Sequence, residues 1–326
     1  MKNVILQDIK NFNKQFGYDP EIKNEGHLPK TAKKFIVCGM GGSHLAADVL
    51  KAWRPELDIA VWSDYGLPPL SDRDKKEYLI IASSYSGNTE ETISAFLEAK
   101  ERRLPIAAVA SGGELVSLAK SFGVPHVILP NAEIQPRMAI GFSIKAICAL
   151  MGEKSALKEL AALENSLVPA RYETIGKKLA KKIKGMIPVV YASRRNGAVA
   201  QNWKVVLNET GKIPAFANVF PELNHNEMAG FDIKKGTRPL SAKFSFIFLR
   251  DGDDDPRIGK RMKTLEGLLR SRGFAVYMVD IRGESRIAKI FSSINTAHWT
   301  AFYLAKLYSV EPEQIPMVEE FKKMIA

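Results

Sequence analysis

Hydrophobic and polar positions form a repeating pattern along the first half of the chain. Short continuous apolar runs, typical of buried strands, alternate with segments in which apolar residues recur at helical spacing. The predicted strands cover residues 34–40, 59–62, 78–83, 106–110 and 124–129. This alternation predicts a parallel sheet with helices on both faces, closed by a buried helix over 138–151.

The same pattern restarts after a helical bridge over 152–184 that is rich in Ala, Leu, Lys and Glu. Predicted strands and helices again alternate, over 187–191, 197–208, 244–249, 255–271, 275–279 and 286–309, with a short helix from about 314 to the end. We therefore expect an α/β protein of two domains, residues 1–152 and 153–326.

The apolar runs, the N-terminal stretch and the cysteines indicate the cellular compartment of the protein. None of the apolar runs approaches the ~20 residues of a membrane helix. The amphipathic N-terminal stretch lacks the continuous apolar core of a signal peptide. The two cysteines, Cys38 and Cys148, lie inside apolar patterns, which is typical of buried, reduced thiols. We expect a cytoplasmic protein without a membrane segment.

The formal charge of +11 raises the question of an anionic partner. The basic residues are spread along predicted helices without interleaved aromatic residues, which argues against nucleic acid. Solvated helix faces and attraction of a phosphorylated substrate remain as explanations. The five histidines show no metal-ligand spacing, so neither a metal site nor a cofactor is expected.

Two segments follow predicted strands and begin helices, where an open parallel sheet binds its ligands. The first, Gly-Met-Gly-Gly-Ser over 39–43, suits close backbone approach to an anion. It is not a dinucleotide fingerprint, because residue 44 is histidine, nor a P-loop. A tight turn is the alternative.

The second segment, over 83–91, has more polar residues than a helix cap needs. Asn88 with Glu91 resembles a capping box, so part of the segment is explained by the start of a helix. The hydroxyls of Ser84, Ser86 and Thr89 are in excess of that need and suit a phosphate monoester held without a metal.

Two acid–base candidates lie in the second half. Glu209 ends the helix over 197–208 just before Gly211, where the helix dipole favours a raised pKa. His225 lies between two asparagines and two glutamates in the run 221–227. From the residues alone, an ordinary helix-end glutamate and a capping or surface histidine are the favoured interpretations.

The run Ser-Tyr-Ser-Gly-Asn-Thr-Glu-Glu-Thr at 84–92 resembles the signature of the sugar isomerase (SIS) domain. Segments 202–209, 214–216, 221–227 and 298–305, in this order, resemble the bifunctional phosphoglucose/phosphomannose isomerases over essentially the whole chain. The resemblance implies two flavodoxin-like, three-layer αβα domains. It also implies a sugar phosphate held by Gly41, Gly42, Ser43, Ser84, Ser86 and Thr89.

The activity that this resemblance implies is reversible isomerisation of glucose 6-phosphate and mannose 6-phosphate to fructose 6-phosphate through an enediol. Glu209 would move the proton between C2 and C1, and Arg137, in a Gln-Pro-Arg element, would stabilise the intermediate. His225, donated by the partner of a homodimer, and Lys322 would assist ring opening, with Lys323 as a rival.

Two alternatives stay open. A non-catalytic sugar-phosphate-binding protein of the same fold would be expected to lose the Glu209 and His225 pair, which is present. A sugar isomerase acting on another sugar phosphate is the second. The chain departs from many members of the family at His44, where they have a small residue.

Overall fold

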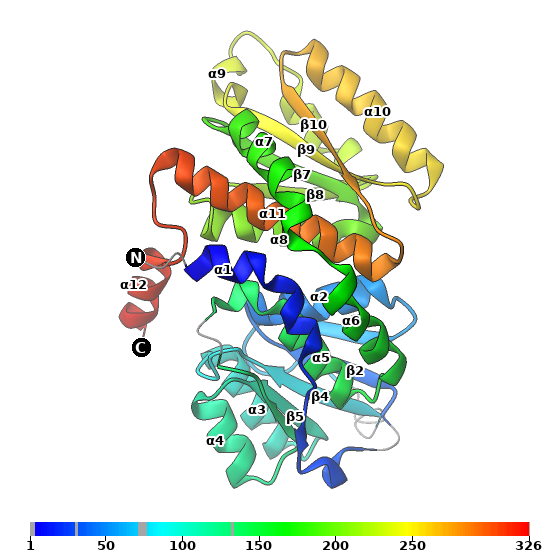
Figure 1. The fold of residues 1–326 in the computed structure, drawn as a ribbon, viewed down its shortest axis with the longest axis vertical. Coiled ribbons are helices and arrows are strands. Elements are labelled where there is room, and N and C mark those ends of the chain that lie inside the picture. The colour runs from blue at the N-terminus through cyan, green and yellow to red at the C-terminus, as the bar shows by residue number, and fades with distance from the viewer. Residues whose placement is uncertain (1–3, 30–31, 71–76, 132–133, 326) are drawn as a thin grey trace. The chain divides into compact units, whose positions relative to one another are not determined.

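A computed structural model describes residues 4–29, 32–70, 77–131 and 134–325 (Figure 1). The chain divides into two compact units, Asn11–Leu167 and Met1–Lys10 together with Val168–Ala326. The sequence placed the division after residue 152, whereas here α6 (Lys154–Ser166) belongs to the first unit. The reason is packing: Glu159 of α6 pairs with Arg54, and Asn13 Nδ2 donates to the Glu164 carbonyl over 2.6 Å.

The sheet of the first unit has the order β1-β6-β5-β4-β2-β3. All of its pairs are parallel apart from the short β1, which runs antiparallel to β6. Without β1, the strands follow the order 2-1-3-4-5 of flavodoxin-like folds. The bounds are β1 Ile22–Lys23, β2 Lys34–Cys38, β3 Asp58–Trp62, β4 Tyr78–Ser83, β5 Ile106–Ala110 and β6 His126–Ile128.

Helices cover both faces of this sheet, as the alternating pattern predicted (Figure 1). On one face, α3 (Glu90–Glu101) and α4 (Gly113–Ser121) bury apolar residues against β2, β4 and β5. On the other, α2 (Gly42–Trp53) packs against α5 (Ile140–Leu150), and the 3-10 segment η1 (Phe12–Gly17) packs against α5 and α6. Two further 3-10 segments are η2 (Glu25–His27) and η3 (Pro136–Met138).

The second unit has a parallel sheet of order β10-β9-β7-β8, with β7 Ile187–Ser193, β8 Phe216–Phe220, β9 Phe244–Asp251 and β10 Ala275–Ile281. In chain order this is 2-1-3-4, the flavodoxin-like order shortened by one strand. Strand β8 is absent from the sequence prediction. It is an edge strand whose residues are mostly half-buried, so it lacks the continuous apolar run that revealed the others.

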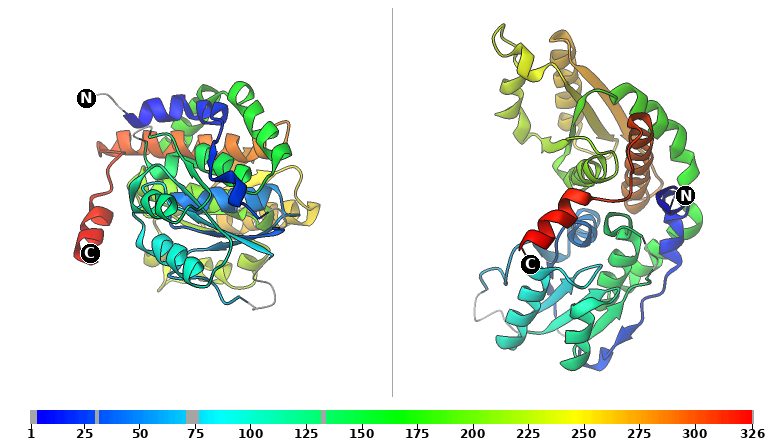
Figure 2. Two further views of the ribbon diagram at one scale, coloured as in Figure 1. Left: turned by 90° about the horizontal axis from the view of Figure 1, so that it is seen from below. Right: turned by 90° about the vertical axis from the view of Figure 1, so that its left-hand side faces the viewer.

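Helices also cover both faces of this sheet, as the right-hand view of Figure 2 shows for α10 (Pro256–Ser271) and α11 (Arg286–Tyr308). With α11 pack α7 (Glu173–Ile183), α8 (Gly197–Glu209) and α1 (Val4–Lys10). The remaining elements are η4 Pro169–Tyr172, η5 Arg194–Asn196, η6 Glu222–Asn224, η7 Glu227–Phe231, α9 Arg238–Ser241 and α12 Pro316–Ile325. None of the helices in the described part of the chain is long and apolar enough to cross a membrane.

Candidate functional site

The strand order of the first sheet reverses between β2 and β4. These strands are hydrogen-bonded neighbours, with Cys38 opposite Ala82, while β3 lies on the outer side of β2. Ligands of open α/β sheets bind beyond the carboxyl ends of the strands at such a switch point. The two predicted phosphate segments, 39–43 and 84–89, both begin there. The fold therefore brings together two segments that lie about forty residues apart in the sequence.

Glycines allow the backbone segments at this edge to touch. A Cβ on Gly39 would lie 2.6 Å from the Ser83 carbonyl oxygen, and a Cβ on Gly42 would lie 2.6 Å from the Pro136 carbonyl carbon. Gly41 has a φ of +51°, which a residue with a side chain rarely adopts. A glycine is therefore required at position 42 for packing as well as for ligand approach, because it lets the backbone before Arg137 pack on the start of α2.

Hydroxyl groups gather in the second segment. Ser43 Oγ accepts a hydrogen bond from the Tyr85 backbone N–H over 2.9 Å, which ties the two segments together. Ser84 Oγ lies 2.8 Å from Thr89 Oγ1 and also accepts from the Gly87 N–H. Ser43 and Ser84 are buried, and Ser86 at the tip of the loop is exposed. The predicted phosphate hydroxyls thus lie on two segments, Ser43 on the first and the other three on the second, and the bond from Tyr85 to Ser43 joins the segments.

The turn at the start of α4, around Gly112 and Glu114, supports the loop over 84–89. The sequence did not predict this contact. Asn88 was predicted to cap α3, but its Oδ1 accepts from the Glu114 N–H at the start of α4. Thr89 occupies the N-cap position of α3 and makes no side-chain cap bond there. Gly87, with φ +75°, contacts Gly112 so closely that a Cβ would overlap its carbonyl oxygen. The capping-box prediction is therefore wrong, since Asn88 serves the neighbouring helix.

Arg137 lies in η3, next to the start of α2. Its side chain is among the largest fully buried ones of the unit, with an exposed fraction of 1%. Its Nη1 donates to Gln135 Oε1 over 3.2 Å. A guanidinium keeps its charge when buried, so a fixed positive charge lies within the first unit close to the glycine segment. Arg137 is therefore a buried arginine and not one on the surface.

His44 is directed along its own helix. Its Nδ1 lies 2.7 Å from Asp48 Oδ2, one turn further along α2, and both side chains are partly exposed. Among the two explanations for this departure from the family, contact with the phosphate loop or a role in the helix, the observed hydrogen bond belongs to the helix.

Glu209 is the last residue of α8 and is half-buried. The helix is fixed to α11 by a hydrogen bond of 3.0 Å from Trp203 Nε1 to Ser293 Oγ. The left-handed residue that follows the helix is Lys212, with φ +56°, and not Gly211. Gly211 instead passes so close to α8 that a Cβ would lie 2.7 Å from the Leu207 carbonyl oxygen.

His225 and Lys322 are both exposed. His225 directly follows η6, where its backbone N–H donates to the Glu222 carbonyl over 2.9 Å. Lys322 lies on α12, with Nζ 3.0 Å from Glu319 Oε1 of the same helix. The segment before α12 is tied to the end of the Glu209 helix, because Lys212 Nζ donates to the Gln314 carbonyl. Glu209, His225 and Lys322 thus lie on three separate segments of the second unit, whereas Arg137 belongs to the first.

The switch point of the second sheet, between β7 and β9, is filled by charged side chains of the chain itself. The buried Asp251 carboxylate lies 2.9 Å from Lys289 Nζ and 3.0 Å from Arg286 Nη1. Asp254 Oδ1 accepts from the Ser193 hydroxyl over 2.7 Å. Burial alone would raise the pKa of Asp251, but hydrogen bonds from Lys289 and its neighbours lower it, whereas burial raises the pKa of Asp254.

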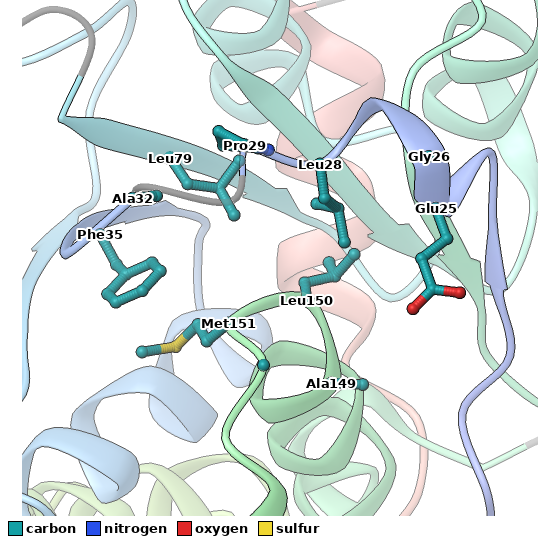
Figure 3. A pocket seen from close by; sticks show the side chains of 11 residues that line it. Glu25, Gly26, Leu28, Pro29, Ala32, Phe35, Leu79, Ala149, Leu150 and Met151 are labelled. Carbon is teal, nitrogen blue, oxygen red and sulfur yellow. The ribbon is translucent and has the colours of Figure 1, made fainter.

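A pocket at the opposite edge of the first sheet is a poor candidate (Figure 3). Phe35 and Leu79 line it near the beginnings of β2 and β4, not near their carboxyl ends. Glu25 is the single polar side chain among the described residues that line it. It offers no donor set for a phosphate.

Metal and thiol chemistry find little support in the described ranges. There, no group of three His, Cys, Asp or Glu residues is placed to hold a metal ion. Both cysteines are free and buried, and burial raises the pKa of Cys38 to about 12. Thiols with raised pKa values are poor nucleophiles.

Comparison with known proteins agrees with this geometry. Residues 173–325 match the family model described as the bacterial phospho-glucose isomerase C-terminal SIS domain. The chain is 35% identical to a bifunctional phosphoglucose/phosphomannose isomerase of Thermoplasma volcanium, over 94% of this chain and 97% of that one. It is 33% identical to the protein of that name from Aquifex aeolicus, over 89% of this chain and 90% of the other.

More distant similarities extend to other sugar phosphates. The chain is 28% identical, over 68% of its length and 71% of the relative's, to a D-glucosamine-6-phosphate 4-epimerase of Sulfolobus acidocaldarius. Among solved structures, a glucosamine-6-phosphate deaminase of Thermotoga maritima has a TM-score of 0.66 at 17% identity, covering 96% of this chain and 97% of that one. This likeness supports the fold.

Proposed function

The chain belongs to the bifunctional phosphoglucose/phosphomannose isomerase family, and from this premise we propose how its residues divide the reaction. The activity is reversible isomerisation of glucose 6-phosphate and mannose 6-phosphate to fructose 6-phosphate. The observation that carries the proposal is the pair of segments at the first switch point, where Ser43 is bonded to the Tyr85 backbone and Ser84 to Thr89.

The phosphate end of the substrate binds to this loop. Backbone N–H groups at the start of α2 and hydroxyls of Ser43, Ser84, Ser86 and Thr89 supply neutral donors, and the two glycines leave room for the phosphate oxygens. Binding at this non-reacting end orients C1 and C2 and so lowers the entropic part of the barrier. The loop is already assembled by its own hydrogen bonds, so little ordering is required on binding.

The carbon acid chemistry follows from a single base. After ring opening, the Glu209 carboxylate takes the proton from C2 of the aldose, and the electron pair moves to form the enediol. Returning this proton to C1, together with transfer of the hydroxyl proton from O2 to O1, gives the ketose. The Arg137 guanidinium stabilises negative charge that develops on the enediol oxygens. Rotation about the C2–C3 bond of the intermediate lets the same base serve glucose and mannose 6-phosphate, which differ at C2.

Ring opening requires two proton transfers. One proton is delivered to the ring oxygen, and another is removed from the anomeric hydroxyl. We assign these transfers to His225 and Lys322, with Lys323 as the rival of Lys322. The support is the exposure of His225 on a short turn and of both lysines on α12. A homodimer in which His225 reaches the site of the partner subunit is part of this proposal.

The proposed reaction needs no metal and no cofactor, since Arg137 supplies the positive charge. Chelation is therefore expected to leave turnover unchanged, and loss of activity with EDTA would point to metal-dependent chemistry. We place the reaction in the cytoplasm, which the two buried, free cysteines support.

The test is turnover of fructose 6-phosphate by purified protein, with glucose 6-phosphate and mannose 6-phosphate scored separately by coupled assays. Both products are expected. Glu209→Gln is expected to abolish turnover while leaving substrate binding intact, and Glu284→Gln, an exposed loop residue, is the matched control. Absence of both products, or unchanged turnover of Glu209→Gln, would overturn the proposal.

A second candidate substrate comes from the similarity to the glucosamine-6-phosphate 4-epimerase. Glucosamine 6-phosphate shares the phosphate and carries an amine at C2. Adding it to the same assay as substrate and as inhibitor separates the two activities, because isomerisation at C2 and epimerisation at C4 give different products.

A further inference from the structure

The carboxylate of Glu227 bridges two strands of the second sheet. The Tyr191 hydroxyl donates to Glu227 Oε1 over 2.5 Å, and Asn218 Nδ2 donates to Glu227 Oε2. Tyr191 on β7 and Asn218 on β8 are paired across the ladder, so their side chains lie on the same face of the sheet. One carboxylate therefore spans two adjacent strands with both of its oxygens bonded.

This bridge holds the segment that carries His225. After β8 the chain forms η6, passes through His225 and reaches Glu227 only two residues later. On the other side of His225, Asn224 Oδ1 accepts from Arg261 Nη1 of α10 over 3.3 Å. His225 is thus the exposed residue between two anchored neighbours, one fixed to the sheet and one to a helix.

The anchor on the sheet is the stronger of the two. Tyr191 is 1% exposed and its ring packs against Phe220, Phe246 and Phe248, so its hydroxyl has a fixed position. Burial and the hydrogen bond to Glu227 raise the pKa of Tyr191, which keeps the hydroxyl protonated as a donor. The bond from Tyr191 is short and comes from a buried group, whereas the bond from Arg261 to Asn224 is 3.3 Å long and exposed to solvent, which weakens it.

We propose that Glu227, held by Tyr191 and Asn218, is a positioning residue that fixes His225 for proton transfer during ring opening. This inference rests on the proposed function, in which His225 takes part in that step. We call the hydrogen bonds of Glu227 to Tyr191 and Asn218 the clamp. Without the clamp, the apolar side chains of Leu223 and Phe231 still hold the turn, but its backbone gains freedom at His225. Displacing a proton-transfer group by about 1 Å costs up to about 100-fold in rate.

The test compares Glu227→Gln and Tyr191→Phe with the wild-type full-length enzyme. We expect kcat for fructose 6-phosphate to fall by about 10- to 100-fold in Glu227→Gln, and by less in Tyr191→Phe. KM should change by less than about 3-fold, because the proposed phosphate donors are untouched. Tyr303→Phe is the matched control, since it removes a Tyr–Glu hydrogen bond to Glu173 away from His225.

A substrate that cannot form a ring gives the decisive readout. 5-Deoxyfructose 6-phosphate lacks the hydroxyl that closes the furanose, so its isomerisation skips ring opening. Glu227→Gln and His225→Asn are both expected to turn it over at nearly the wild-type rate. If Glu227→Gln lowers kcat equally on both substrates, the proposal that Glu227 positions His225 for ring opening is wrong. The substitution would then have damaged the unit as a whole.

The two proposals fail differently. If His225→Asn keeps the wild-type kcat on fructose 6-phosphate, the assignment of His225 in the proposed function is wrong. If His225→Asn loses activity while Glu227→Gln and Tyr191→Phe do not, only the clamp is overturned. Thermal unfolding of each variant identifies any that fails to fold. If Glu227→Gln does not fold, Tyr191→Phe still tests the clamp, because it removes only the hydroxyl that donates to Glu227.

Discussion

The hydroxyl oxygen of Ser84 lies 2.8 Å from that of Thr89, across the turn that joins β4 to α3. One of the two hydroxyls donates to the other, so the pair leaves a single free donor for a ligand. The Gly87 N–H also donates to Ser84 Oγ, which holds this oxygen in place. The geometry indicates that Ser84 and Thr89 act together on a bound phosphate oxygen.

Removing either hydroxyl should therefore weaken binding of the substrate. A hydrogen bond to a charged group contributes about 1.5–3 kcal/mol, so Ser84→Ala or Thr89→Val should raise KM by about 10- to 100-fold. The double variant should cost less than the product of the single effects, because the two residues share one donor. Steady-state kinetics with Ser117→Ala, an exposed serine on α4, as control would show this. Fully multiplicative effects would contradict joint action.

Gly42→Ala tests the contact between the start of α2 and the segment before Arg137. The added methyl would lie 2.6 Å from the Pro136 carbonyl, a backbone group that cannot move alone. Overpacking of this kind costs about 1–3 kcal/mol of unfolding free energy. We expect lower stability together with a lower kcat/KM, because Arg137 moves with the segment.

Gly259→Ala on α10 is the control for the same substitution. A Cβ there meets nothing within 4 Å, and alanine in an exposed helix is favoured by about 0.5–1 kcal/mol over glycine. Urea unfolding curves of both variants measure the difference. Equal stability of Gly42→Ala and the wild type would show that the backbone at residue 136 relaxes freely.

Continuous apolar runs made the strands and the parallel sheets predictable from the sequence. Strand β8 escaped prediction because half-buried edge residues give no such run. The phosphate loop was found because it holds more hydroxyls than a cap requires. Local patterns miss contacts set by tertiary packing: Asn88 caps a helix that begins 25 residues later, and Glu227 meets Tyr191 across 36 residues.

The charged cluster at the second switch point leads to a prediction about stoichiometry. There, Asp251 with Arg286 and Lys289 occupies the place that the phosphate loop occupies in the first sheet. We expect one sugar phosphate per chain. Calorimetric titration with glucitol 6-phosphate, which lacks the reacting carbonyl, should give one site per chain, and two sites of similar affinity would contradict this.

Two aspartates of that cluster should respond oppositely to the same substitution. Asp251→Asn removes the buried carboxylate from the half-buried Arg286 and leaves Lys289 with Asp253 alone, which should lower stability by up to about 3 kcal/mol. Burial raises the pKa of Asp254, so its ionisation opposes folding at neutral pH. Asp254→Asn keeps the Oδ1 that accepts from Ser193 and should leave stability at pH 7 equal or higher.

The pH dependence of stability follows the same signs. The lowered pKa of Asp251 contributes stability above the unfolded aspartate pKa of about 3.9, and this contribution is lost as pH falls through the lower folded value. The raised pKa of Asp254 has the opposite effect, since its penalty fades as pH falls through its folded value toward 3.9. Unfolding free energies at pH 7 and below about pH 4 should therefore show a smaller loss on acidification for Asp251→Asn than for the wild type. A larger loss would mean that the Asp251 carboxylate does not hold these cations in the folded protein.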